Sequence, residues 1–137
     1  AGPTSLGAAL ERVGRLARRR SVVVIVSDFR GPRDWRSRLL RLAARHDVIA
    51  VEIRDPREQH LTDVGHIWVV DPETGRELSV DTRSRKLRDR FNAVAAEDRD
   101  ELAAQLRSLG VAHVVLSTHG EWLKPLVRFL LIERRRR

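Results

Sequence analysis

Ser21-Val22-Val23-Val24-Ile25-Val26-Ser27-Asp28-Phe29 is the stretch that decides the fold. Its run of apolar residues is too continuous to leave one face in water, so it predicts a central strand of a parallel sheet covered on both sides. Asp28 follows directly, at the carboxyl end of the strand, which is where open α/β sheets place their ligands. The stretch therefore predicts a fold class and a candidate functional residue together.

The flanking segments complete a strand–helix–strand unit. Apolar residues recur at helical spacing from Ser5 to Arg20 and again from Trp35 to about Arg45, and each stripe predicts an amphipathic helix. A second strand is predicted from Val48 to Ile53. Strands that alternate with helices form right-handed βαβ crossovers, so the predicted class is α/β, with three layers around a parallel sheet.

The second half of the chain contains a segment of a different kind. Two short apolar runs, Ile67–Val70 and Glu77–Val80, flank a turn with proline early and glycine at its end. This pattern predicts an antiparallel hairpin added to the parallel core, and turn chemistry accounts for Asp71 and Glu73. A long helical region, either one bent helix or two in series, a third strand and a closing helix follow: Leu87–Leu109, Val111–Ser117 and Trp122–Leu130.

Length and composition restrict the class of protein. The 137 residues are 42% hydrophobic, enough for one domain with a core, and we expect residues 1–133 to form one partial domain before a basic tail, residues 134–137. The chain has no cysteine, which excludes disulfides and thiolate sites and favours the cytoplasm. No apolar run is long enough to span a membrane. Because the chain starts at Ala1 and contains no methionine, we expect a fragment of a longer protein.

The positive charge leaves a nucleic-acid interpretation open. The formal net charge is +8, but almost all of it comes from arginines that are spread over every predicted helix. Such a distribution is typical of solvated helix faces. A polyanion site, if present, is expected at the clusters Arg18–Arg20 or Arg134–Arg137, and a basic nucleic-acid-binding module is therefore one alternative function.

The histidines do not predict a zinc site, since none of the five has the spacing of a ligand pair. Ser117-Thr118-His119-Gly120 places hydroxyls and an imidazole after the third strand, at the same edge of the sheet as Asp28. Loop and capping chemistry demands the same residue types, so a structural interpretation is favoured there.

Thr4 and Asp28 form the candidate metal site. Thr4 precedes the first helix and Asp28 ends the first strand, so both are expected at the edge where strands end and helices begin. A hydroxyl beside a carboxylate suits a hard cation such as Mg²⁺. The structural alternatives are that Thr4 caps its helix and that Asp28 braces the loop from Phe29 to Asp34.

Four segments, in order along the chain, resemble a known family. They are Pro3-Thr4-Ser5-Leu6-Gly7-Ala8-Ala9-Leu10, Val24-Ile25-Val26-Ser27-Asp28-Phe29, Leu42-Ala43-Ala44-Arg45-His46-Asp47-Val48 and Val69-Val70-Asp71-Pro72-Glu73-Thr74-Gly75. Together they cover most of the chain and resemble the MoxR-associated proteins that carry domain of unknown function 58, which is similar to a von Willebrand factor A domain.

This resemblance implies a metal-ion-dependent adhesion site. Such a site combines an Asp-x-Ser-x-Ser motif with a later threonine and a later aspartate; Thr4 and Asp28 resemble the last two, and the motif has no counterpart here. The chain thus resembles the C-terminal part of the domain. Since Mg²⁺ prefers nearly octahedral oxygen coordination, we expect these two residues to bind it weakly or not at all.

The implied function is a non-enzymatic interaction module. The proteins that this chain resembles are partners of MoxR-type AAA ATPases in the assembly or maturation of other proteins, sometimes at the cell envelope. The sequence leaves open whether a longer parent protein is associated with a membrane. In a complete site, the ion bridges to an acidic side chain of the partner.

Two further expectations follow from the strand that ends at Asp28. An enzymatic alternative makes Asp28 the phosphoacceptor of an Mg²⁺-dependent site, but no acidic pair precedes it and no strand-end lysine accompanies it. If a preceding strand of the parent domain is absent, Val22 to Val26 becomes an uncovered edge. Self-association through that edge, or its shielding by rearranged elements, is then expected.

Overall fold

The computed structural model describes residues 5–71 and 74–136, and these form two compact units. The first, which we call the sheet unit, comprises residues 1–54 and 102–137. The second, the hairpin unit, comprises residues 55–101. Each is described by itself below.

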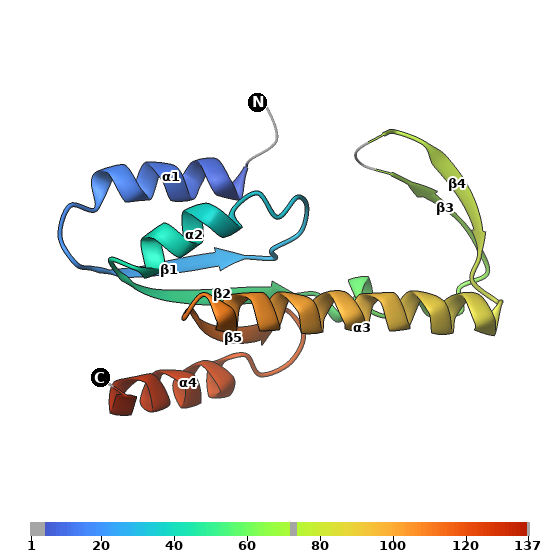
Figure 1. Ribbon diagram of the computed structural model, residues 1–137. Helices are drawn as coiled ribbons and strands as arrows, with labels where there is room; N and C mark the ends of the chain where they lie inside the picture. Colours follow the sequence, from blue (N-terminus) through green and yellow to red (C-terminus); the bar gives the residue numbers. More distant parts are fainter. Residues whose placement is uncertain (1–4, 72–73, 137) are drawn as a thin grey trace. The chain divides into compact units, whose positions relative to one another are not determined.

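Three parallel strands form the centre of the sheet unit. They are β1 (Val22–Ser27), β2 (Asp47–Arg54) and β5 (Ala112–Ser117), in the order β1-β2-β5. Helices α1 (Leu6–Leu16), α2 (Arg36–Ala43) and α4 (Leu123–Arg136) belong to the same unit, with α1 and α2 on one face of the sheet and α4 on the other (Figure 1). The predicted α/β class and the parallel pairing are confirmed.

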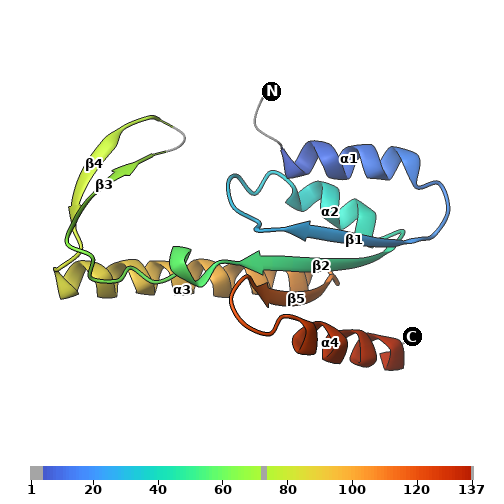
Figure 2. The ribbon, with the colours of Figure 1, turned by 180° about the vertical axis from the view of Figure 1, so that it is seen from behind.

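The core lies on both faces of this sheet. Leu10, Leu39 and Leu42 from α1 and α2 pack with Ile25, Val48 and Ala50, and Leu102 and Leu106 from the end of α3 (Arg85–Ser108) complete this larger cluster. The opposite face carries a smaller cluster, in which Leu126 and Phe129 of α4 cover Ile49, Val51, Val114 and Leu116. Figure 2 shows the ribbon of α4 on the side of the sheet away from α1 and α2. Alternate residues of β2 thus enter different clusters, as the period of a strand requires.

The expectation that β1 is a central, doubly covered strand is wrong. Among the strands of the described residues, β1 lies at an edge of the sheet and pairs with β2 alone, in register from Val22↔Asp47 to Ser27↔Glu52. Val22, Val24 and Val26 are 51%, 55% and 65% exposed. The physical reason is that α4 packs over β2 and β5, while α1 and α2 cover only the face of β1 that carries Ile25.

The hairpin unit contains the predicted antiparallel pair, β3 (His66–Val70) and β4 (Glu77–Asp81), preceded by a short 3-10 helix at Pro56–Glu58. The hairpin is confirmed. It forms a two-stranded sheet of its own, separate from the three-stranded parallel sheet. Gly75 has a φ of 68°, in the left-handed region that glycine tolerates, and Pro72 and Glu73 of the turn lie outside the described residues.

Two helices settle questions left open by the sequence. α3 is one continuous helix of 24 residues, so the acidic cluster at Asp98 and Asp100 does not interrupt it. α4 continues to Arg136, so the basic residues Arg134 and Arg135 are helical. Among the helices of the described residues, none is both long and apolar enough to cross a membrane.

Candidate functional site

Asp28 lies where the sequence predicts, immediately after the carboxyl end of β1, and its side chain is exposed. Its Oδ1 atom accepts a hydrogen bond from the backbone N–H of Arg30 at 3.1 Å, which braces the loop after the strand. Within residues 5–71 and 74–136, no other side chain pairs with this carboxylate. Asp28 therefore combines the predicted bracing role with an accessible oxygen.

Thr4 lies outside the described residues, so the predicted Thr4–Asp28 pair stays a prediction. The neighbouring Ser5 is the N-cap of α1, where its Oγ accepts a hydrogen bond from the N–H of Ala8 at 3.3 Å. The same hydroxyl donates to Asp34 Oδ2 at 3.3 Å. This bond connects the start of α1 to the loop that begins at Asp28, so the two segments expected at one rim are neighbours.

Phe29 holds the Asp28 loop in a strained conformation. Its φ is 53°, in the left-handed region that costs a residue with a Cβ atom about 1–2 kcal/mol. The ring is buried and packs edge-to-face on Trp35, with 5.6 Å between the ring centroids. The Ser27 hydroxyl accepts the Phe29 N–H at 3.0 Å. Burial of the ring thus fixes the turn that presents Asp28 to solvent.

A buried ionic network lies near the carboxyl end of β2 and was missed by the sequence interpretation. Glu52 is only 3% exposed, and Arg54 donates to both of its carboxylate oxygens, at 2.6 Å and 3.1 Å. His113 Nε2 is 2.7 Å from Glu52 Oε2 and donates to it, since a carboxylate only accepts. A charged residue inside the otherwise apolar run Val48–Ile53 is the signal that could have revealed a buried partner.

Burial of Glu52 opposes its ionisation and by itself raises the pKa of the carboxyl group. The hydrogen bonds from His113 and Arg54, with the positive charges beside them, outweigh burial, so the pKa of Glu52 is lowered. Both oxygens are engaged by these donors. The network therefore suits bracing of β2 against β5.

Ser117, the last residue of β5, and the following Thr118 and His119 lie at the same rim and are explained by loop chemistry. The Ser117 hydroxyl accepts the N–H of His119 at 3.1 Å, and the Thr118 N–H continues the ladder to the Arg54 carbonyl at 2.8 Å. Among the described residues, no group of three or more acidic, histidine or cysteine side chains is placed to hold a metal ion. The ion site implied by Thr4 and Asp28 stays a prediction.

The sequence model of the family described as protein of unknown function DUF58 matches residues 1–101. The chain belongs to the DUF58 family. An uncharacterized protein of Mycobacterium avium is 41% identical over 132 residues, which are 95% of this chain and 76% of that relative. Uncharacterized proteins of Mycobacterium tuberculosis and Mycobacterium bovis are 42% identical over the same length.

This DUF58 chain spans 41% of the length of the M. tuberculosis and M. bovis relatives. No solved structure matches the chain. The family match confirms the predicted domain of unknown function 58. The association with MoxR and the likeness to a von Willebrand factor A domain stay proposals.

Proposed function

We propose that this DUF58 chain is a non-enzymatic protein–protein interaction module, whose partner is a MoxR-type AAA ATPase as in the proteins that it resembles. The observation that supports this most strongly is the apolar face of β1. Val22, Val24 and Val26 are exposed side by side on an edge strand, and exposed apolar surface of this kind marks sites of protein interaction.

The edge of β1 offers two features to a partner. One edge of its backbone has no neighbouring strand among the described residues, so a further strand can pair there. The valines continue the face that carries Ile49 and Val51, since Val24 is paired in register with Ile49 and Val26 with Val51. A strand or helix placed on this face would extend a core that already exists. Self-association through Val22 to Val26 uses the same two features.

Asp28 supports the proposed relation to a von Willebrand factor A domain. It lies beside the apolar face, at the carboxyl end of the edge strand, with an exposed carboxylate on a braced loop. In this proposal residues 1–133 form part of such a domain, and Thr4 and Asp28 are the remnant of its metal-ion-dependent adhesion site. Two oxygen ligands without the Asp-x-Ser-x-Ser motif would hold Mg²⁺ weakly, so recognition by this chain rests on the β1 surface.

The proposal is tested by measuring binding of the chain to a purified MoxR-type AAA ATPase, by light scattering coupled to size exclusion. Val24→Lys places a charge on the β1 face, and Val127→Lys places the same charge on α4, where Val127 is also exposed. We expect Val24→Lys to weaken the complex at least about tenfold and Val127→Lys to leave it unchanged, because a desolvated interface rejects an unpaired charge.

Absence of a complex with the wild-type chain, or equal weakening by the two substitutions, would contradict the proposal. The same light-scattering runs report self-association in the absence of the ATPase. A further measurement tests whether Mg²⁺ at Asp28 takes part: the affinity of this chain for the ATPase should be the same in Mg²⁺ and in EDTA. Asp28→Ala separates this ion from the Mg²⁺ of the ATPase, and a complex lost both in EDTA and on Asp28→Ala would show that recognition needs an ion at Asp28.

A further inference from the structure

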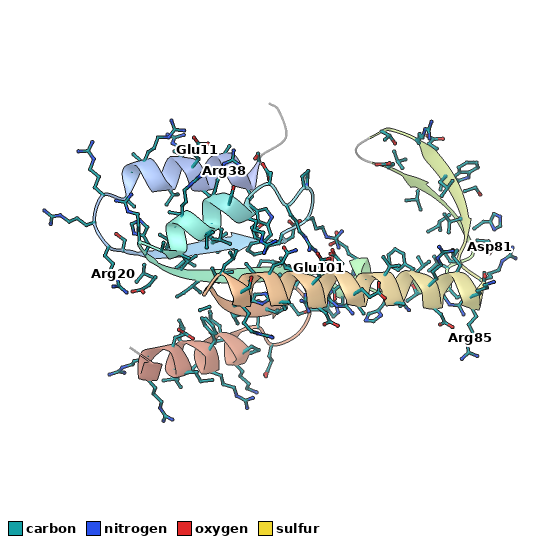
Figure 3. The ribbon with its side chains drawn as sticks, in the orientation of Figure 1. Glu11, Arg20, Arg38, Asp81, Arg85 and Glu101 are labelled. Carbon is teal, nitrogen blue, oxygen red and sulfur yellow. The ribbon has the colours of Figure 1, made fainter. Side chains whose placement is uncertain are left out.

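A second surface of the sheet unit has an unusual charge. A groove of about 210 Å³ lies between α1 and α2, and it is lined by four arginines, by Glu11 and by His46. The arginines are Arg15, Arg38, Arg41 and Arg45. Figure 3 shows Glu11 and Arg38 close together, on the neighbouring helices α1 and α2. The edge of β1 and the Asp28 loop do not contribute to this groove.

The positive charge of the groove is only partly balanced. Glu11 pairs with Arg15 at 3.3 Å and with Arg38 at 3.5 Å, and Arg38 also lies 3.9 Å from the carboxylate of Asp34. The side chains of Arg41 and Arg45 have no ion-pair or hydrogen-bond partner in the described part of the chain. Two like charges four residues apart repel each other, although the helix dipole at the carboxyl end of α2 offsets some of this cost.

One buried donor in the groove, on His46, also lacks an acceptor. The side chain of His46 is buried, and its Nδ1 accepts the N–H of Ser21 at 3.3 Å, so the proton of the neutral ring is on Nε2. His46 Nε2 makes no hydrogen bond within residues 5–71 and 74–136. Arg38 Nε makes none there either, but it lies 3.5 Å from Glu11 Oε2, so its charge is already paired. A buried donor without an acceptor is costly, and a bound acceptor would remove that cost.

We propose that this groove is a binding site for a small molecule that carries phosphate groups. A phosphate oxygen accepts hydrogen bonds from several donors at once, and the planar fork of arginine matches phosphate geometry. Arg41 and Arg45 supply the free charges, while the Nε2–H of His46 supplies a buried donor that lacks an acceptor. The volume of the groove favours a compact anion over a folded partner.

Calorimetric titration with pyrophosphate, at physiological ionic strength, tests this site. The double variant Arg41→Ala with Arg45→Ala removes the two free charges. Its matched control, Arg134→Ala with Arg135→Ala, removes the same charge from exposed positions of α4. We expect the first variant to lose at least about tenfold in affinity and the control less than about twofold, because only the first loses charged hydrogen bonds.

A magnetic-resonance readout addresses the base of the groove without a substitution. Pyrophosphate should shift the Nε2–H signal of His46 and leave that of His113, which already has an acceptor in Glu52. Absence of pyrophosphate binding to the wild-type chain would overturn the proposed site. An equal loss of affinity in the two double variants would also overturn it, because pyrophosphate would then be attracted by the net charge of the chain alone. Tighter binding of a single-stranded oligonucleotide through Arg41 and Arg45 would replace it with a nucleic-acid interface.

Discussion

The two units of the chain are stabilised in different ways. All the fully buried apolar side chains of the described residues lie in the sheet unit, where two clusters cover the faces of β2. In the described part of the hairpin unit the one buried side chain is that of Thr82. The sheet unit therefore has its own hydrophobic core, and the hairpin unit depends on other interactions.

Polar contacts take the place of a core in the hairpin unit. Thr82 Oγ1 accepts the N–H of Val64 at 3.0 Å and donates to the carbonyl of Gly65 at 2.6 Å. Asn92 accepts the N–H of Leu61, and Arg99 donates to Gln59. Meanwhile Trp68 is 73% exposed. A two-stranded hairpin of this kind is marginally stable in water, so we expect it to open locally while the sheet unit stays folded.

A matched pair of leucine substitutions should show the largest difference. Leu106 is fully buried in the sheet unit, and Leu78 is largely exposed on β4. Leu106→Ala should lower the free energy of unfolding by roughly 2–5 kcal/mol through lost burial and the cavity it leaves. Leu78→Ala should change it by less than about 0.5 kcal/mol. Chemical denaturation followed by circular dichroism measures both, and equal losses of stability would contradict the difference between the two units.

The buried network of the sheet unit should give the next largest effect. Glu52→Gln keeps the shape and removes the charge that Arg54 and His113 surround, so it should cost roughly 1–3 kcal/mol of folding stability. Because the pKa of Glu52 is lowered in the folded chain, its contribution is present above the ordinary value of 4.5 and is lost as the pH falls through the folded value.

This prediction is tested by measuring the free energy of unfolding of the wild-type chain and of the Glu52→Gln variant at several pH values. The difference between wild type and Glu52→Gln should be constant near neutral pH and shrink in acid. A difference that did not depend on pH would mean that the ionised carboxylate is not what stabilises β2 against β5.

Thr82→Val should affect the hairpin unit alone. Valine has nearly the shape of threonine but cannot replace the two hydrogen bonds at the base of the hairpin, so local opening should become easier by about 1–2 kcal/mol. Amide exchange in β3 and β4 should accelerate, with the denaturation midpoint of the sheet unit unchanged. Thr62→Val, at an exposed position, is the control. A lower midpoint for the whole chain would show that the two units unfold together.

The smallest effect is expected at Asp81, at the end of β4. Its carboxylate accepts hydrogen bonds from the side chain and the backbone N–H of Arg83, and these lower the pKa of Asp81 to about 2. Arg83→Ala should raise this pKa toward the ordinary 3.8, as seen by magnetic resonance of the side-chain carboxyl carbon. The contribution of the Asp81–Arg83 pair to folding stability is therefore fully present above the ordinary pKa of 3.8 and is lost as the pH falls toward 2. An unchanged pKa would exclude Arg83 as the cause.

Local patterns in the sequence predicted the elements but not their neighbours. The run Val22–Val26 identifies a strand, because a continuous β-branched run has few alternatives. Its position at the edge depends on which other strands pair with it and on where α4 packs, and neither is encoded within the run. The register of a parallel pair is likewise set by residues far apart in the chain.

In the candidate site, too, the sequence predicts single positions but not the contacts between distant segments. The position of Asp28 after β1 follows from the strand pattern, since the end of an apolar run is visible in the sequence. The strained turn at Phe29 and the bond from Ser5 to Asp34 depend on packing between distant segments. Glu52 could have been recognised as a buried charge, but its partner His113 is 61 residues away, with no local signal to join them.

Amide hydrogen exchange on the wild-type chain tests the central contrast most directly. We expect the paired amides of β2 to exchange only through unfolding of the sheet unit, and those of β3 and β4 to exchange at least about a hundredfold faster through local opening. Equal protection in the two units would contradict it, because the hairpin unit would then have stability that its polar contacts do not explain.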